Sequence, residues 1–92
     1  MNLRTFAKGK DCQVRIPGVC NFDPATTVLA HIRRGGVAGV GQKPPDLCAV
    51  ISCSACHDAI DGRLGPFNTA SDTDILEALC RTLALVSKEI KV

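Results

Sequence analysis

Apolar residues along the chain gather in two short runs. Residues 28–32 read VLAHI, and residues 47–51 read LCAVI. Short apolar runs that include β-branched residues and lie between turn residues are typical of buried strands. We therefore expect two short strands, joined by a long glycine-rich loop over residues 33–45.

The rest of the pattern predicts helices around these strands. Residues 2–8 fit a helical turn that ends at Gly9, Pro24 can start a second turn, and residues 54–61 fit a short helix. Ser71 is a suitable N-cap for a longer last helix. Its apolar face recurs at spacings of three and four residues and consists of Leu76, Leu79, Leu83, Val86 and Ile90. We expect this face to pack on the protein's own core, and a homodimer seam is the alternative.

Length and composition indicate one domain over residues 1–92 that needs help to hold its core. The chain has three Phe and no Trp or Tyr, and small domains often add a metal or disulfides. Six cysteines could form a secreted disulfide scaffold. However, the first residues lack the apolar stretch of a signal peptide, and no apolar segment is long enough to span a membrane. We therefore expect a cytoplasmic protein with no membrane segment, whose cysteines bind metal.

Four of the cysteines have spacings that suit a zinc ion. Cys53 and Cys56 form a CxxC turn, which places two thiolates on one side of a tight loop. Cys12 and Cys20 are farther apart, but the turn signal Pro17-Gly18 lets this segment fold back as a hairpin. One Zn²⁺ held by all four would tie this hairpin to the helix that begins at the CxxC motif. A structural zinc contributes on the order of 10 kcal/mol to the folding of small domains.

His57 follows the CxxC motif directly, and Asp61 lies four residues later on the same helix face. A His/Asp pair at this spacing can bind a hard divalent cation such as Mg²⁺, with water and phosphate completing its coordination. Two alternatives remain open at this point. His57 could bond locally, or it could replace a cysteine as a zinc ligand.

His31 ends the first predicted strand, where the chain enters the glycine-rich loop. A strand end holds a side chain rigidly, and a neutral imidazole there could accept a proton from water that attacks a phosphodiester. An ordinary core histidine is the alternative. Arg33 and Arg34 follow, and their guanidinium groups could bind phosphate or simply be solvated.

The charge distribution adds a polyanion-facing side. Residues 1–46 hold seven Lys/Arg against three Asp, a net charge of +4, whereas residues 47–92 hold four against six acids, a net charge of −2. Such asymmetry fits binding to nucleic acid, although a merely solvated surface would look the same.

These residues together resemble a known family. A cysteine pair, a strand that ends in histidine, a long loop and a CxxCH motif resemble the HNH (His-Me finger) endonucleases. The runs CQVRIPGVC (12–20), LAHIR (29–33), KPPDL (43–47) and CSACHD (53–58) more closely resemble the YbcO family of prophage-encoded nucleases. The resemblance implies that His31 is the general base and that His57 binds the catalytic metal. It also makes Asp46 the nearest stand-in for the central Asn of HNH, and it places Ala30 where many HNH enzymes have a metal ligand.

The sequence thus predicts a small α+β domain, a zinc-stapled ββα-metal fold of HNH type with an added C-terminal amphipathic helix. The expected function is metal-dependent endonucleolytic hydrolysis of nucleic acid, most readily DNA, for a phage or prophage. Two other classes of function remain: a non-catalytic zinc module that binds DNA or protein, and a structural protein that dimerises through its last helix.

Overall fold

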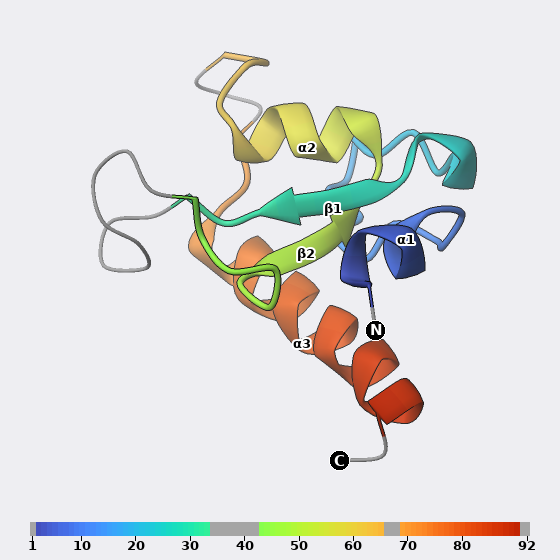
Figure 1. Ribbon diagram of the computed structural model, residues 1–92. Coiled ribbons are helices and arrows are strands. Elements are labelled where there is room, and N and C mark those ends of the chain that lie inside the picture. Colours follow the sequence, from blue (N-terminus) through green and yellow to red (C-terminus); the bar gives the residue numbers. More distant parts are fainter. Residues whose placement is uncertain (1, 34–42, 66–68, 91–92) are drawn as a thin grey trace.

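A computed structural model describes residues 2–33, 43–65 and 69–90 of the chain. Figure 1 shows the two strands between one helix above and a longer helix below, with the first helix beside them. In chain order the elements are α1 (Leu3–Ala7), the 3₁₀ turn η1 (Pro24–Thr26), β1 (Val28–His31), β2 (Ala49–Ser52), α2 (Ser54–Ile60) and α3 (Asp72–Ile90). The predicted α+β class with two short strands is confirmed.

The antiparallel register of β1 and β2 decides which residues face each helix. Ala30 pairs with Val50, and Leu29 pairs with Ile51. Because side chains alternate along a strand, these two pairs lie on opposite faces of the sheet. Ala30 and Val50 belong to the buried core that also contains Cys56 of α2. Leu29 and Ile51 line an apolar hollow on the other face, whose walls come from α1 and α3.

The outer edge of β2 is covered by polar contacts. The backbone N–H of Ile51 donates to Thr82 Oγ1 of α3 at 3.1 Å, and the Ile51 carbonyl accepts from the Gln13 N–H at 2.8 Å. Arg81 of α3 donates from Nε to the Gln13 carbonyl at 2.7 Å. These bonds satisfy an edge that would otherwise be open to another strand. They also fix the segment that carries Cys12 against α3.

Helix α3 begins as predicted. Ser71 Oγ accepts the N–H of Asp74 at 3.0 Å, and Asp74 Oδ2 accepts the N–H of Ser71 at 3.0 Å. This reciprocal pair is a capping box, which satisfies two N–H groups at the helix start.

The predicted packing face of α3 is wrong in part. Leu76 is 61% exposed and Leu83 is 41% exposed, whereas Val86 is buried and Leu79 is half-buried. The buried residues of the helix are instead Ile75, Ala78, Thr82 and Val86, and Leu79 packs against the core beside them. The packing face is therefore shifted toward Ile75 and Thr82, whose Oγ1 accepts the Ile51 N–H of β2. A homodimer seam over the exposed leucines stays a prediction, and the side chain of Ile90 lies outside the described residues.

Candidate metal centre and active-site pocket

The four predicted cysteines come together. The Sγ atoms of Cys12, Cys20, Cys53 and Cys56 all lie within 4.8 Å of one another, and those of Cys20 and Cys53 are 3.8 Å apart. A tetrahedral zinc site with Zn–S bonds of about 2.3 Å has sulfur–sulfur edges of about 3.8 Å. All six cysteines are free thiols, so no disulfide scaffold forms. The cluster could therefore hold a metal ion, and its dimensions are compatible with zinc.

Local backbone structure presents these sulfurs. Cys53 is the N-cap of α2, and its Sγ accepts the N–H of Cys56 at 3.3 Å. The segment from Cys12 to Cys20 is an irregular loop rather than the predicted hairpin. Its turn is closed by the N–H groups of Val19 and Cys20, which both donate to the Ile16 carbonyl at 3.1 and 2.9 Å. The turn at Pro17 thus brings Cys12 and Cys20 together, as the hairpin was expected to do, but without strand pairing.

The thiol pKa values differ within the cluster. Burial raises the pKa of Cys56, and the neighbouring charge of Cys12 raises it further. Burial also raises the pKa of Cys20. At Cys53 burial acts in the same direction, but it is outweighed by hydrogen bonds from the backbone N–H groups of Cys56 and Asn21, which bring the pKa down to about 7. A cation bound at the centre would hold the remaining thiols as thiolates, because metal ligation replaces their protons.

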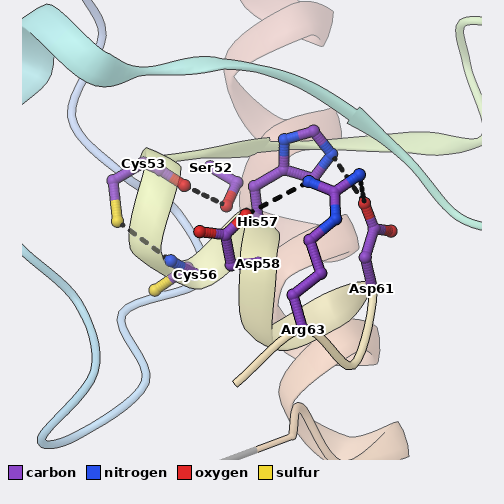
Figure 2. Close-up of polar contacts among 7 residues, drawn as sticks. All are labelled: Ser52, Cys53, Cys56, His57, Asp58, Asp61 and Arg63. Atoms are coloured by element: carbon purple, nitrogen blue, oxygen red, sulfur yellow. Dashed lines mark hydrogen bonds and ion pairs between the residues drawn. The ribbon is translucent and has the colours of Figure 1, made fainter. Parts of the chain in front are cut away.

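His57 lies on α2 one residue after Cys56 and is not part of the sulfur cluster. Its Nε2 lies 3.4 Å from Asp61 Oδ2 at the C-cap of the helix. Figure 2 shows the guanidinium of Arg63 reaching the same carboxylate, with its Nη2 3.3 Å from Asp61 Oδ2. The predicted i, i+4 pair is therefore formed, and it has a third, cationic member, Arg63, that was not predicted.

His31 ends β1, as predicted, and its side chain is 8% exposed. Its Nε2 lies 2.7 Å from Asp46 Oδ1, within hydrogen-bonding distance. The Nε of Arg4 in α1 lies 3.7 Å from the same oxygen. Asp46, the residue nearest to the central Asn of HNH by sequence, thus contacts the imidazole directly.

Both histidines open onto one pocket of about 520 Å³. Its walls come from α1, β1, α2 and the turn after α2, and Val28 and Leu29 of β1 line it from alternate faces of the strand. The pocket therefore follows the outer edge of β1. Its polar lining comprises His31, His57, Asp61, Arg4, Lys8, Arg33, Lys43 and Arg63.

Arg33 lines this pocket, is exposed, and has no ion pair within the part of the chain that the structure describes. Arg34, predicted with it, lies outside the described residues. Arg4 lies in α1 and Lys8 is the C-cap of that helix, and only the overall charge asymmetry of the sequence indicated them. Arg63 lies in the acidic half of the sequence, where charge gave no signal.

Ala30 is a departure from the HNH pattern, and its position in the fold accounts for it. Its side chain is fully buried in the core between β1 and α2. In many HNH enzymes this position carries a metal ligand, but here the side chain packs in the core. The pocket is instead lined by His31 at the end of β1 and by His57 and Asp61 of α2 and its C-cap.

The fold and the site define a small α+β protein in which a four-cysteine cluster, which could hold a metal ion, lies at the start of α2 beside a basic, histidine-containing pocket. The family model described as "Putative nuclease YbcO" matches residues 1–90, and the chain belongs to this YbcO family. It is 53% identical over 89 residues to "Putative nuclease YbcO" of Escherichia coli (strain K12). It has the same identity to "Putative nuclease ybcO" of Enterobacteria phage 82, and each match covers 96% of this chain and 93% of the relative.

A solved structure is similar as well. It is described as a putative bacteriophage protein from Escherichia coli str. K-12 substr. MG1655, and it is 46% identical with a TM-score of 0.71. The match covers 97% of this chain and 100% of that chain. The predicted YbcO resemblance is confirmed.

Among the described helices, none has the length and apolar character to cross a membrane.

Proposed function

We propose that this protein is a metal-dependent endonuclease that hydrolyses phosphodiester bonds in DNA on behalf of a phage or prophage. Two relatives at 53% identity carry the names "Putative nuclease YbcO" and "Putative nuclease ybcO", and the second belongs to a phage. The observation that carries the proposal is that His31, His57 and Asp61 all line one basic pocket. The free thiols also fit a reducing compartment, which supports the cytoplasm as the site of action.

The charge of the pocket suits a polyanion. Five cationic side chains line it, with Asp61 as the one carboxylate of the lining. Clustered Lys and Arg side chains attract the phosphate backbone and bind it without reading its sequence. Arg33, which no described acid pairs, is the best placed of them to grip phosphate, and we propose Arg34 as its neighbour in this role.

His31 is the proposed general base. When Nε2 donates its proton to Asp46 at 2.7 Å, Nδ1 is left as the proton acceptor of the neutral imidazole. The Asp46 carboxylate holds this tautomer and stabilises the imidazolium that forms when Nδ1 takes a proton from water. The proton acceptor thus belongs to a side chain that both the strand end and a hydrogen bond hold in place.

His57 and Asp61 fit a divalent cation. Adjacent ligands in a Mg²⁺ octahedron with bonds of about 2.1 Å lie about 3 Å apart, and Nε2 and Oδ2 are separated by 3.4 Å here. These two atoms would hold Mg²⁺ or a similar ion, which when bound supplies charge stabilisation for the phosphate and the leaving oxygen. Zn²⁺ between the four cysteines would fix Cys56, and with it the start of the helix that carries His57.

Plasmid nicking tests the proposal. Wild type should relax supercoiled DNA in Mg²⁺ or Mn²⁺ and should be inactive in EDTA. His31→Ala should lose this activity while it keeps its zinc content and its circular dichroism spectrum. An exposed substitution on α3, Lys88→Gln, is the matched control and should cut as wild type does.

The second candidate is a non-catalytic zinc module that binds DNA. The buried Ala30 favours it, because the position of one metal ligand in many HNH enzymes is lost to packing. If wild type and His31→Ala bind DNA equally and neither cuts it above background, the module is correct and the nuclease proposal is wrong.

A further inference from the structure

Among the described cations that line the pocket, Arg63 is the one that forms an ion pair with a proposed metal ligand. Its Nη2 lies 3.3 Å from Asp61 Oδ2, and its Nη1 lies 3.2 Å from Asp58 Oδ1. Figure 2 shows the guanidinium between these two carboxylates, beside the ring of His57. Asp61 Oδ2 therefore faces His57 Nε2 and Arg63 at the same time.

The backbone places Arg63 at this point. Gly62 follows Asp61, the C-cap of α2, at a φ of +75°, in the left-handed region that glycine adopts readily. The N–H of Arg63 donates to the Asp58 carbonyl at 2.8 Å, and the N–H of Gly62 donates to the Ala59 carbonyl at 3.2 Å. This pair of bonds is a Schellman motif, which turns the chain back across the helix end. The guanidinium is thus directed at the carboxylates by a fixed turn.

The same oxygen cannot serve two cations well. A divalent ion bound to His57 Nε2 and Asp61 Oδ2 would lie next to the guanidinium, and like charges at such distances repel strongly. Asp61 and His57 are the better-held partners, with 20% and 31% of their side chains exposed, whereas 63% of the Arg63 side chain is exposed. Arg63 is the member free to move.

A displaced Arg63 has room within reach of substrate. Besides the main pocket, it lines an adjoining one of about 470 Å³, and Arg33 and Asp61 line both. Two guanidinium groups beside one open volume suit bidentate binding of phosphate oxygens.

From these contacts we propose that Arg63 is an internal counter-ion of Asp61, which a divalent cation displaces, and that the freed guanidinium then binds substrate phosphate. The second half of this inference rests on the proposed nuclease function, whereas the first half concerns the cation alone. Cation binding and phosphate binding become coupled, because each depends on where Arg63 lies.

Calorimetric titration with Mn²⁺, without nucleic acid, tests the first half. Arg63→Gln removes the competitor, so its Mn²⁺ dissociation constant should fall by about two- to fivefold, the effect expected for breaking a weak exposed ion pair. Lys88→Gln removes one positive charge from an exposed position on α3 and should leave the constant unchanged. His57→Ala should abolish the site.

A merely structural ion pair predicts a different result. Arg63→Gln would then lower the melting temperature and leave Mn²⁺ affinity unchanged or weaker, and this outcome would overturn the inference. The inference is also overturned if wild type has no Mn²⁺ site that His57→Ala removes.

Binding of a short DNA duplex with and without Ca²⁺ tests the coupling. Ca²⁺ should lower the dissociation constant of wild type for DNA. The factor by which Ca²⁺ lowers it should be about tenfold smaller for Arg63→Gln. Equal gains in both proteins would show that Arg63 does not bind phosphate. Failure of the nuclease proposal is distinguishable, because it shows as absent cleavage while the Mn²⁺ titrations still give their own answer.

Discussion

Replacing Asp46 tests how much the carboxylate contributes to His31 as a base. A hydrogen bond to a charged group contributes roughly 1.5–3 kcal/mol. The His31 side chain is 8% exposed but that of Asp46 is 43% exposed, so solvent screening favours the lower end, about 1.5–2 kcal/mol. At 1.36 kcal/mol for each tenfold change in rate, Asp46→Ala should slow cleavage by about 10- to 30-fold. Asp46→Asn keeps an acceptor without its charge, so its rate should fall between those of Asp46→Ala and wild type.

Single-turnover cleavage of end-labelled DNA at saturating protein is the assay, because it reports the chemical step and not product release. Glu89→Gln, which removes an exposed acid on α3, is the matched control and should cleave at the wild-type rate. If Asp46→Ala cleaves at the wild-type rate while His31→Ala does not cleave, the 2.7 Å contact has no part in activating the base. The assignment of Nδ1 as the proton acceptor would then be refuted.

Four further predictions concern the metal, the phosphate and the fold. Cys56→Ser should lose zinc and unfold, because a structural zinc contributes on the order of 10 kcal/mol, comparable to the whole stability of a small domain; zinc analysis and circular dichroism check this. Zinc affinity, measured against a chromophoric chelator, should weaken as pH falls. The reason is that Cys20 and Cys56, whose pKa values are raised, must release protons when they bind zinc. A pH-independent affinity would contradict this ligand set. Arg33→Ala should weaken DNA binding at every sequence tested and lower the slope of log affinity against log salt by about one. Thr82→Val leaves the buried Ile51 N–H without its 3.1 Å acceptor and should cost about 1–3 kcal/mol in urea unfolding; a loss below 0.5 kcal/mol would show that this edge contact is dispensable.

Short-range patterns predicted the local structure well. The strand that ends at His31, the helix that begins at Cys53 and the cap at Ser71 depend on neighbours within a few residues. The i, i+4 contact of His57 with Asp61 follows from helix geometry alone. These features could be predicted because their determinants are adjacent in the sequence.

Packing between distant segments could not be predicted in the same way. The leucine spacing of α3 is periodic, but Ile75, Ala78 and Thr82 are the residues that become buried, and Thr82 bonds to the Ile51 N–H of β2. Spacing cannot rank two neighbouring faces of a helix that both carry apolar residues.

Two contacts of the pocket also depend on tertiary structure. Asp46 meets His31 across fifteen positions of sequence, and Arg4 joins them from α1. Arg63 could have been found, because a glycine directly after a predicted helix indicates a chain reversal that returns the next side chain to the helix end. The residue that signals this reversal is Gly62. The acidic composition of residues 47–92 gave no reason to expect a cation of the pocket in that half of the sequence.

A crystal structure with Mn²⁺ and a short DNA duplex tests the central claim most directly, that one pocket holds the base, the metal and the phosphate. Anomalous scattering should locate Mn²⁺ on His57 Nε2 and Asp61 Oδ2, and zinc between the four cysteine sulfurs. A backbone phosphate should lie between the Mn²⁺ and His31 Nδ1, with a water within hydrogen-bonding distance of Nδ1. A duplex bound on another face, or Mn²⁺ bound away from His57, would contradict the account.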